Sequence, residues 1–365
     1  MRPDHPSGAL GTDKNRRWGR SLASAGAMPA ACQDGAVHRM IRPSPDTALA
    51  LHCSAEGIFT VEIAGTLVED TFAEAFGMRY VRLIVTAHDE HWLDAAQRAV
   101  AGYGSSIIAC DAEIGLEQPL SADATPDGRP GIALLAFGFS ADALAKAIAN
   151  RTGQCLMTCP TTAVYDGLEP GSEQIPLGKH LRFFGDGFQK SKLVGGRRYW
   201  RIPVMDGEFV VVDRLTVRKG VAGGNIILQS DTAAGALDAA RRASQALAHL
   251  PGIITPFPGG VARSGSKVGS RYKALRASTA DAFCPTLRGR VATQLREDVH
   301  CAYEIVIDGL TLEAVERATA AGLHSALRNA ESIVSVTSGN YGGKLGPFHI
   351  RLHDVLKRYA SAVHS

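Results

Sequence analysis

The feature of this 365-residue sequence that most restricts its fold is a strand–helix–strand pattern that occurs four times after Phe59. Each unit begins with an apolar run of strand length and continues with apolar residues three or four positions apart, the spacing of one helix face. The first strands are expected at YVRLIVTA (80–87), GIALLAFG (131–138), NIILQS (225–230) and CAYEIVID (301–308). The second strands are expected at SSIIACD (105–111), QCLMTC (154–159), IITPF (253–257) and SIVSVTSG (332–339).

The helices between these strands have identifiable ends and apolar faces. Ser140 and Thr311 are good N-caps for the second and fourth helices, and Gly153 is the expected stop of the second. The expected core faces carry Trp92 or Leu93, Ala96 and Val100; Leu144, Ala147 and Ile148; Leu237, Ala240, Ala243 and Leu247; and Leu312, Val315, Gly322 and Leu323. Residues 182–212 have Gly-containing turns between strand-like runs and are expected to form hairpins.

Four such units in two pairs predict an α+β fold with two ferredoxin-like split-βαβ lobes, at 59–200 and 201–363. A doubly wound single sheet is the alternative. Residues 1–58 are rich in Ala, Pro, Arg and Ser and have no sustained periodicity. We expect them to be a disordered N-terminal extension or an over-long start of translation.

Composition excludes several classes of function. Hydrophobic residues make up 45% and charged residues 21% of the chain, as in a soluble globular protein, and the net charge of +3 gives no case for nucleic-acid binding. No apolar run approaches the roughly 20 residues of a membrane span. The seven cysteines form no C-x-x-C pair, so we expect reduced thiols in a cytoplasmic protein. His88 and His91 could meet on a helix but lack a third ligand nearby, so we expect no metal site.

Four glycine-rich segments follow expected strands: TPDGRPG (125–131), FFGDGFQ (183–189), FPGGVARSGSKVG (257–269) and GNYGGKLG (339–346). Turns favour Gly and Asp for purely structural reasons, and this interpretation holds for each segment alone. The last segment is not a phosphate loop, because Ser338 occupies the first glycine position and Leu345 follows Lys344. Together, four segments with polar or basic residues favour an extended polar cleft.

Glu304 is a carboxylate in the middle of an apolar strand, on the face shared by Ala302 and Val306. If it is buried, its pKa rises and the neutral carboxyl can donate a hydrogen bond to a developing oxyanion. A solvent-exposed or arginine-paired glutamate is the equally good structural alternative. Cys284 could act as a nucleophile, but a buried inert thiol is the better interpretation.

Eight ordered motifs now make the chain recognisable, and they are DTFAEAFGM, TPDGRPG, FFGDGFQ, RYWRIPVMDGEF, PFPGGVARSGSKVGS, ASTADAFCPTLRG, YEIVIDGL and SGNYGGKLG. From about Phe59 to the C-terminus the sequence resembles the formylmethanofuran–tetrahydromethanopterin formyltransferase family. One departure is Ala280, where the family pattern has Asn after AST.

The resemblance implies formyl transfer between the amine of methanofuran and N5 of tetrahydromethanopterin, both of which are substrates, with no permanently bound cofactor and no metal. It assigns the catalytic role to Glu304 in the YEIVI motif. The residues that it assigns to substrate binding are Arg129, Asp186, Arg263, Ser264, Ser266, Lys267, Asn340, Tyr341 and Lys344. The glycine loops would then be walls for a long pterin and a furan-containing tail.

The resemblance also implies a homotetramer. The near-neutral charge and the segments VMDGEF and RYKAL favour the bacterial form, a subunit of a formyltransferase/hydrolase complex in one-carbon oxidation. That form passes the formyl group to methanofuran, and hydrolase subunits then release formate. A non-catalytic scaffold subunit that keeps the fold and binds pterin is the alternative.

Overall fold

The computed structural model describes residues 49–53 and 59–360. Most of the expected disordered extension, residues 1–48 and 54–58, lies outside this part of the chain. Strand β1 (Leu49–Cys53) is an exception, because it pairs in antiparallel register with β2 (Phe59–Ile63). The prediction of disorder is therefore wrong for these five residues: the free edge of β2 supplies backbone partners that composition does not reveal.

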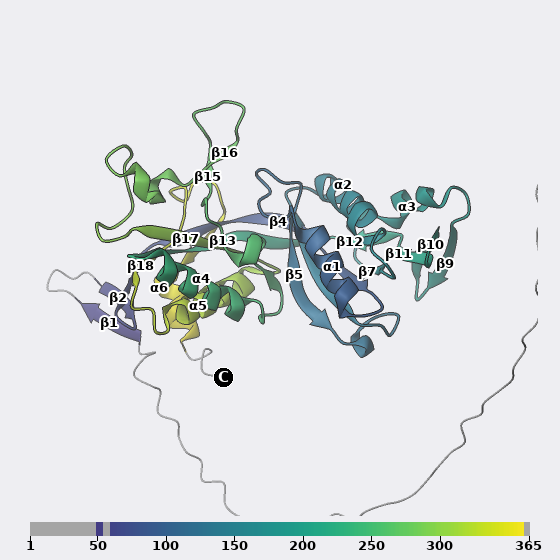
Figure 1. Cartoon of the computed structure of the whole chain (residues 1–365), viewed down its shortest axis with the longest axis horizontal. Helices are drawn as coiled ribbons and strands as arrows, with labels where there is room; N and C mark the ends of the chain where they lie inside the picture. Colours follow the sequence, from purple (N-terminus) through teal and green to yellow (C-terminus); the bar gives the residue numbers. More distant parts are fainter. Residues whose placement is uncertain (1–48, 54–58, 361–365) are drawn as a thin grey trace, which may run out of the picture. The chain divides into compact units, whose positions relative to one another are not determined.

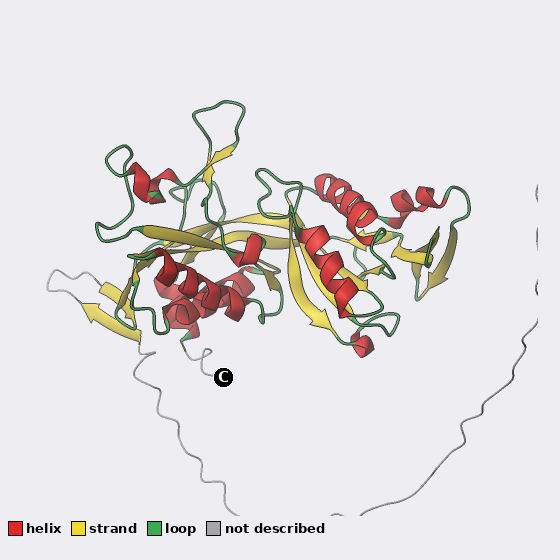
Figure 2. Ribbon diagram, in the orientation of Figure 1, coloured by secondary structure: helices red, strands yellow, loops and turns green. Residues whose placement is uncertain are grey.

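The described residues form a mixed α and β fold around one large mixed sheet (Figures 1 and 2). Its long central strands are β4 (Phe72–Thr86) and β13 (Arg218–Ser230), which pair with each other over 76–80 and 218–222. Of the described strand pairings, two are parallel, β7 with β11 and β3 with β18. The doubly wound alternative needs a mainly parallel sheet and is wrong.

The other strands of the first half of the chain are β3 (Thr66–Val68), β5 (Glu113–Leu120), β6 (Gly131–Gly138), β7 (Ala163–Asp166), β8 (Gln174–Pro176), β9 (Lys190–Val194) and β10 (Arg197–Val204). Those of the second half are β11 (Gly207–Val212), β12 (Arg214–Thr216), β14 (Ile253–Ile254), β15 (Lys267–Val268), β16 (Ala277–Ser278), β17 (Cys301–Gly309), β18 (Ile333–Thr337) and β19 (Phe348–Arg351). The helices are α1 (Glu90–Ala101), α2 (Ala141–Arg151), α3 (Gly178–Leu181), α4 (Ala233–Leu247), α5 (Leu312–Leu327) and α6 (Leu352–Tyr359).

Two large clusters of buried apolar side chains organise these elements. In the first, α1 and α2 pack on β4, β6 and β7, and the predicted faces of both helices are confirmed: Leu93, Ala96, Val100, Leu144, Ala147 and Ile148 are buried. The predicted caps are also confirmed, because the Ser140 and Thr311 side chains accept from Ala143 N and Ala314 N. This cluster includes residues up to Val217, and Trp200 lies inside β10. The lobe division at Trp200 stays a prediction.

In the second cluster, α4 and α5 pack on one face of β13 and β17, and α6 packs against α5 and β19. That face carries Ile226, Leu228, Ile305 and Ile307, all fully buried. The prediction that Leu237 belongs to the core is wrong, because its side chain is 45% exposed. Helix α4 buries the neighbouring face, which carries Ala236, Ala239, Ala240 and Ala243. Small residues allow the helix to approach the sheet closely, and Leu237 points away from this contact.

Two predicted strands are also wrong. Residues 105–111 form turns, because Ala109 and Cys110 donate back to Ser106 O, and the strand begins later at Glu113. Residues 154–159 are not extended either, since Gly153 does not stop the helix and a π-helical turn (Thr152–Leu156) continues α2. This turn buries Leu156 completely in the first cluster, and the sheet position is filled by β7 instead. Apolar runs of this length fit a strand or a buried helical turn equally well.

The loop 339–346 is held by Glu74, a buried residue of β4. Its carboxylate accepts four backbone N–H groups of the loop, from Tyr341 (2.7 Å), Gly343 (2.9 Å), Leu345 (2.5 Å) and Gly346 (2.5 Å). We call these four hydrogen bonds the Glu74 clamp. Burial alone would raise the pKa of Glu74, but the four donors hold it below its ordinary value.

Wrapping the loop around one carboxylate explains its glycines. Gly342 and Gly343 both have φ +71°, and a Cβ at Gly346 would lie 2.4 Å from the carbonyl oxygen of Ala75. Side chains larger than hydrogen are strained in the first two positions and clash in the third.

We expect Glu74→Gln to destabilise the fold by about 3 kcal/mol. The substitution replaces one carboxylate oxygen, which accepts backbone N–H groups, by an NH₂ group that can only donate. Urea unfolding at pH 7 checks this, with the exposed Glu331→Gln as the control. Because the folded pKa is lowered, the wild-type contribution is present above the unfolded pKa, near 4.5, and is lost as the pH falls through the folded value. Equal stability of Glu74→Gln and wild type at pH 7 would contradict the clamp.

Candidate functional site

A cavity of about 990 Å³ lies against the face of β13 and β17 that does not contact the helices. Asn225, Ile227, Glu304 and Val306 line it, whereas the alternate residues of the same strands belong to the core beneath. The hairpin β15–β16 and the loop 339–346 contribute further walls; in Figure 1 the hairpin projects on the opposite side of β13 and β17 from α4 and α5. This volume is at the upper end of those found for small-molecule sites.

Glu304 is 6% exposed and lines this cavity. Its backbone pairs on one side with Ile227 of β13 and on the other with Ala262. These pairings fix the position of the Glu304 Cα, from which the side chain extends. Oε2 has no hydrogen-bond partner among the described residues. Burial raises the pKa of Glu304 to about 7, against the opposing effect of a hydrogen bond from the Ser266 backbone. Near pH 7 the carboxyl therefore exists in both its protonated and its ionised form, and below pH 7 the protonated form predominates.

Tyr341 lies beside Glu304 and is placed by the Glu74 clamp. Its backbone N–H donates to Glu74, and its side chain is hydrogen-bonded to that of Ser266. Burial, and then the nearby Glu304 carboxyl, raise the pKa of the Tyr341 phenol, which stays protonated. Glu304, Tyr341 and Ser266 thus form one polar group on the cavity wall, in which Tyr341 carries a proton at neutral pH and Glu304 carries one below a pH of about 7.

Farther along β17, Asp308 forms a pair of carboxyl groups with Glu113 of β5. Asp308 is on the same strand face as Glu304, four residues and about 13 Å away, and it is hydrogen-bonded to the buried Glu113. Asp308 accepts Gly223 N–H, and Glu113, which lines the cavity, accepts Ile107 N–H. Burial, and then the adjacent Glu113, raise the pKa of Asp308 well above its ordinary value, so the two carboxyls share a proton.

The cavity lining is rich in carboxyl groups. Six acidic residues line it, against two basic ones: Glu69, Asp70, Glu74, Glu113, Asp281 and Glu304, against Lys267 and Arg276. Lys267 Nζ lies 2.8 Å from Asp281 Oδ2, and this lysine lowers the pKa of Asp281. The interior therefore suits ligand groups that donate hydrogen bonds better than it suits free anions.

The structure brings together five of the ten residues predicted for the site. Glu304, Ser266, Lys267, Asn340 and Tyr341 all line the cavity. Three others, Arg263, Ser264 and Lys344, belong to the same two segments but are exposed and do not line it. Asp186 is exposed in a left-handed turn (φ +47°) near β9 and β10, also outside the lining. Two of the four glycine-rich segments thus contribute walls, and 125–131 and 183–189 do not.

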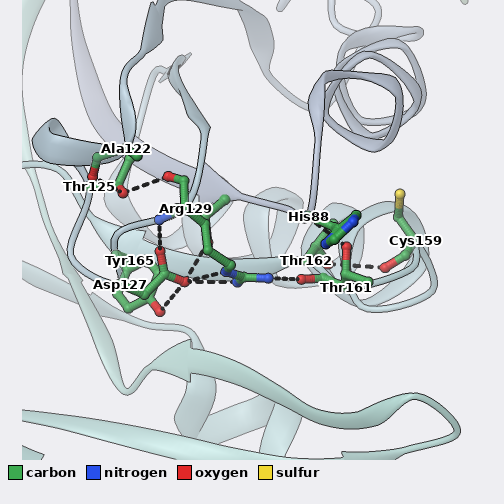
Figure 3. Close-up of polar contacts among 10 residues, drawn as sticks. His88, Ala122, Thr125, Asp127, Arg129, Cys159, Thr161, Thr162 and Tyr165 are labelled. Carbon is green, nitrogen blue, oxygen red and sulfur yellow. Dashed lines mark hydrogen bonds and ion pairs between the residues drawn. The ribbon is translucent and has the colours of Figure 1, made fainter. Parts of the chain in front are cut away.

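Arg129 belongs to a separate polar network (Figure 3). Its guanidinium donates to Asp127 Oδ2 (2.8 Å), Thr161 O (2.5 Å) and Thr86 Oγ1 (2.8 Å), and Tyr165 OH donates to the same Asp127 oxygen. These bonds fasten the loop 125–131 to β4 and to the segment before β7. The alternative interpretation of this motif as a structural turn accounts for what the guanidinium contacts.

Three further positions matter for the site. Ala280 lines the cavity, so the departure from the family pattern places a methyl group where an amide is expected. Glu74 and Asp308 were not among the predicted residues. Glu74 stands between Ala73 and Ala75 in an apolar strand, which is the same signal that singled out Glu304.

No group of His, Cys, Asp and Glu in the described residues is placed to hold a metal ion. Cys110, Cys155, Cys159, Cys284 and Cys301 are free thiols. None of the helices in residues 49–53 and 59–360 is long and apolar enough to cross a membrane.

Comparison with known proteins gives close relatives over most of the chain. The family model described as formylmethanofuran-tetrahydromethanopterin formyltransferase matches residues 61–204, and the model of the proximal lobe of the same family matches 207–355. The enzyme named formylmethanofuran–tetrahydromethanopterin formyltransferase of Methylobacillus flagellatus is 49% identical, over 80% of this chain and 99% of its own. One subunit of the formyltransferase/hydrolase complex of Methylorubrum extorquens is 46% identical, over 81% of this chain and 98% of its own.

Solved structures agree. A formyltransferase/hydrolase complex (FhcABCD) from Methylorubrum extorquens, in complex with methylofuran, matches with a TM-score of 0.78 and 45% identity, over 81% of this chain and 99% of the other. The formylmethanofuran:tetrahydromethanopterin formyltransferase of Methanosarcina barkeri matches with a TM-score of 0.75 and 40% identity, over 80% and 99%. The chain belongs to the formylmethanofuran–tetrahydromethanopterin formyltransferase family.

Proposed function

We propose that this protein transfers a formyl group between N5 of tetrahydromethanopterin and the amine of methanofuran or a close analogue. The observation that carries the proposal is the neutral, buried Glu304 with an unpartnered oxygen on the cavity wall. Two relatives, which are 49% and 46% identical to this chain, are named as a formyltransferase and as a subunit of a formyltransferase/hydrolase complex, and these names support formyl transfer.

In this reaction the attacking amine nitrogen forms a bond to the formyl carbon, and negative charge develops on the formyl oxygen. Glu304 donates a hydrogen bond to that oxygen, which is worth about 3 kcal/mol in comparable acyl transfers. The tetrahedral intermediate then breaks its bond to the original nitrogen. The proton lost by the attacking amine is taken up by the leaving nitrogen, so the overall reaction neither releases nor consumes a proton.

The walls of the cavity supply the remaining requirements. Tyr341 and the loop 339–346 are fixed by Glu74, so substrates would be aligned by a backbone that cannot relax easily. The acidic lining favours the amine and the N–H donors of a pterin, and it leaves the anionic tails for the exposed Arg263 and Lys344 at the same two segments. Lys267 would bind substrate inside the cavity, which it lines.

We also propose the finer assignments that the family implies. These are two ferredoxin-like lobes, a cytoplasmic homotetramer, and transfer toward formylmethanofuran for hydrolysis to formate. Partnership with hydrolase subunits is supported by the M. extorquens complex, which the described chain matches over 81% of its length. A direct formyl-transfer assay with both free carriers separates this function from a non-catalytic pterin-binding scaffold.

We expect Glu304→Ala to lower kcat by about 10² to 10³, as loss of an oxyanion donor does elsewhere, and Glu304→Gln to lower it less. Because the neutral acid is the donor, wild-type kcat should fall as the pH rises above about 7, whereas Glu304→Gln should show no such decline. Steady-state kinetics from pH 5 to 9 measure both effects, with the exposed Glu331→Ala as control. Near wild-type transfer by a folded Glu304→Ala would make Glu304 a merely structural carboxyl.

The same carboxyl should affect stability. Its folded pKa is about 7 and its unfolded value is near 4.5, so its stabilising contribution is complete below pH 4.5 and is lost as the pH rises through 7. We expect Glu304→Gln to gain about 3 kcal/mol relative to wild type between pH 4.5 and pH 8. Parallel unfolding curves at both pH values test this, and a constant difference would show that the carboxyl ionises freely.

We expect Lys344→Ala to raise KM for at least one carrier and to leave kcat nearly unchanged, because an exposed lysine outside the lining can act only on a remote anionic group. Kinetics with each carrier varied in turn check this, and the exposed Lys357→Ala is the control. A fall in kcat at constant KM would instead place Lys344 in the chemical step.

A further inference from the structure

The segment 183–189, which the cavity does not use, belongs to an exposed apolar surface. Six of the thirteen exposed large apolar side chains in the described part of the chain lie between residues 183 and 205. They are Phe183, Phe184, Phe188, Leu193, Val194 and Met205, and Phe188 is 77% exposed. We call the surface formed by residues 182–205 the distal tip. Apolar side chains that gather on a surface in this way mark interaction sites.

Local contacts make the distal tip one surface. The guanidinium carbon of Arg182 lies 4.7 Å from the centroid of the Phe183 ring and 4.8 Å from that of Trp200 in β10. Gly185 packs against Gln189 and Pro203, where a Cβ would lie 2.8 Å and 3.3 Å from their atoms. The Phe-bearing turn is therefore fastened to the hairpin β9–β10.

The distal tip is also strongly basic. Residues 182–205 contain six Lys or Arg and one Asp, a formal charge of +5 in a chain whose total is +3. Arg201 pairs with Glu208 and Arg197 with Asp166, but Lys190 and Lys192 have no acidic partner among the described residues. Both lysines and Val194 lie on one face of β9.

Strand β9 is an open edge of the sheet. It pairs with β10, no other described strand pairs with it, and all five of its residues are exposed. Figure 1 shows β9 beyond β10 and β11 at this end of the sheet. Such an edge presents backbone N–H and C=O groups on which another protein's strand can pair.

These observations select the kind of occupant. Two copies meeting through the same patch would bring the lysines of each edge together, and edge lysines are a known protection against such pairing. A lipid surface would satisfy the basic and apolar side chains but not the backbone groups of β9. A strand of a different protein that carries Asp or Glu opposite the lysines satisfies all three features.

We propose that the distal tip docks an acidic, apolar-centred strand of a partner protein, which adds to the edge of β9. This inference rests on the proposed function, since the partner is sought among the hydrolase subunits of the proposed complex. The lysines attract the acidic strand, and Phe183, Phe184 and Leu193 cover its apolar side chains. The tip would thus fix the transferase to the hydrolase without using the residues of the cavity.

The test uses the full chain and the purified hydrolase subunits encoded by the same genome, with binding measured by calorimetry at low and high salt. The charge-reversal variant Lys190→Glu/Lys192→Glu and the apolar variant Leu193→Ser/Val194→Ser are compared with wild type. Lys146→Glu/Arg241→Glu, exposed lysine and arginine on α2 and α4, is the matched control. Circular dichroism confirms that each variant folds.

We expect the charge reversal and the apolar change each to weaken binding about tenfold or more, and the control to bind as wild type. Formyl transfer between free carriers should be unchanged in all three, so a failure of the transferase assay concerns the proposed function and not the tip. The proposal is overturned if wild type does not bind the subunits or if both tip variants bind as tightly as wild type. It is also overturned if the tip variants lose only self-association, or only binding to anionic phospholipid vesicles.

Discussion

The candidate site depends on one interaction, the clamp that Glu74 makes on the loop 339–346. A buried carboxylate normally costs free energy, but four backbone donors compensate this one and keep it ionised. The loop in turn carries Tyr341 to the side of Glu304. The glycines near the C-terminus thus allow the loop to bind a carboxylate of the protein itself.

Two glutamates in apolar strands therefore take opposite roles because their donors differ. Glu74 accepts four N–H groups and stays charged, which suits a fixed structural anchor. Glu304 has one oxygen without a partner among the described residues, and burial raises its pKa to about 7. Burial of a carboxyl costs much free energy only when the group ionises. In its protonated form the carboxyl can donate a hydrogen bond to a developing oxyanion.

The sequence predicts the helices of this fold better than some of its strands. Helix faces and caps at Ser140 and Thr311 are local properties, and they are confirmed. The errors fall at 105–111 and 154–159, where tertiary contacts decide between a turn, a helical turn and a strand. Glu304 could be found from its apolar neighbours. Glu74 has the same pattern, but its role depends on a loop about 270 residues away. The substrate-binding role of Arg129 stays a prediction, and its partners among the described residues belong to a separate network.

The central claim is that the Glu304 carboxyl of the folded protein keeps its proton up to a pH of about 7. Difference infrared spectroscopy between wild type and Glu304→Gln, titrated from pH 4 to pH 9, observes the carbonyl stretch of the protonated carboxyl directly. We predict a protonated band that is half lost at a pH of about 7. A band already lost near pH 4.5, the value of a freely solvated glutamate, would contradict the account.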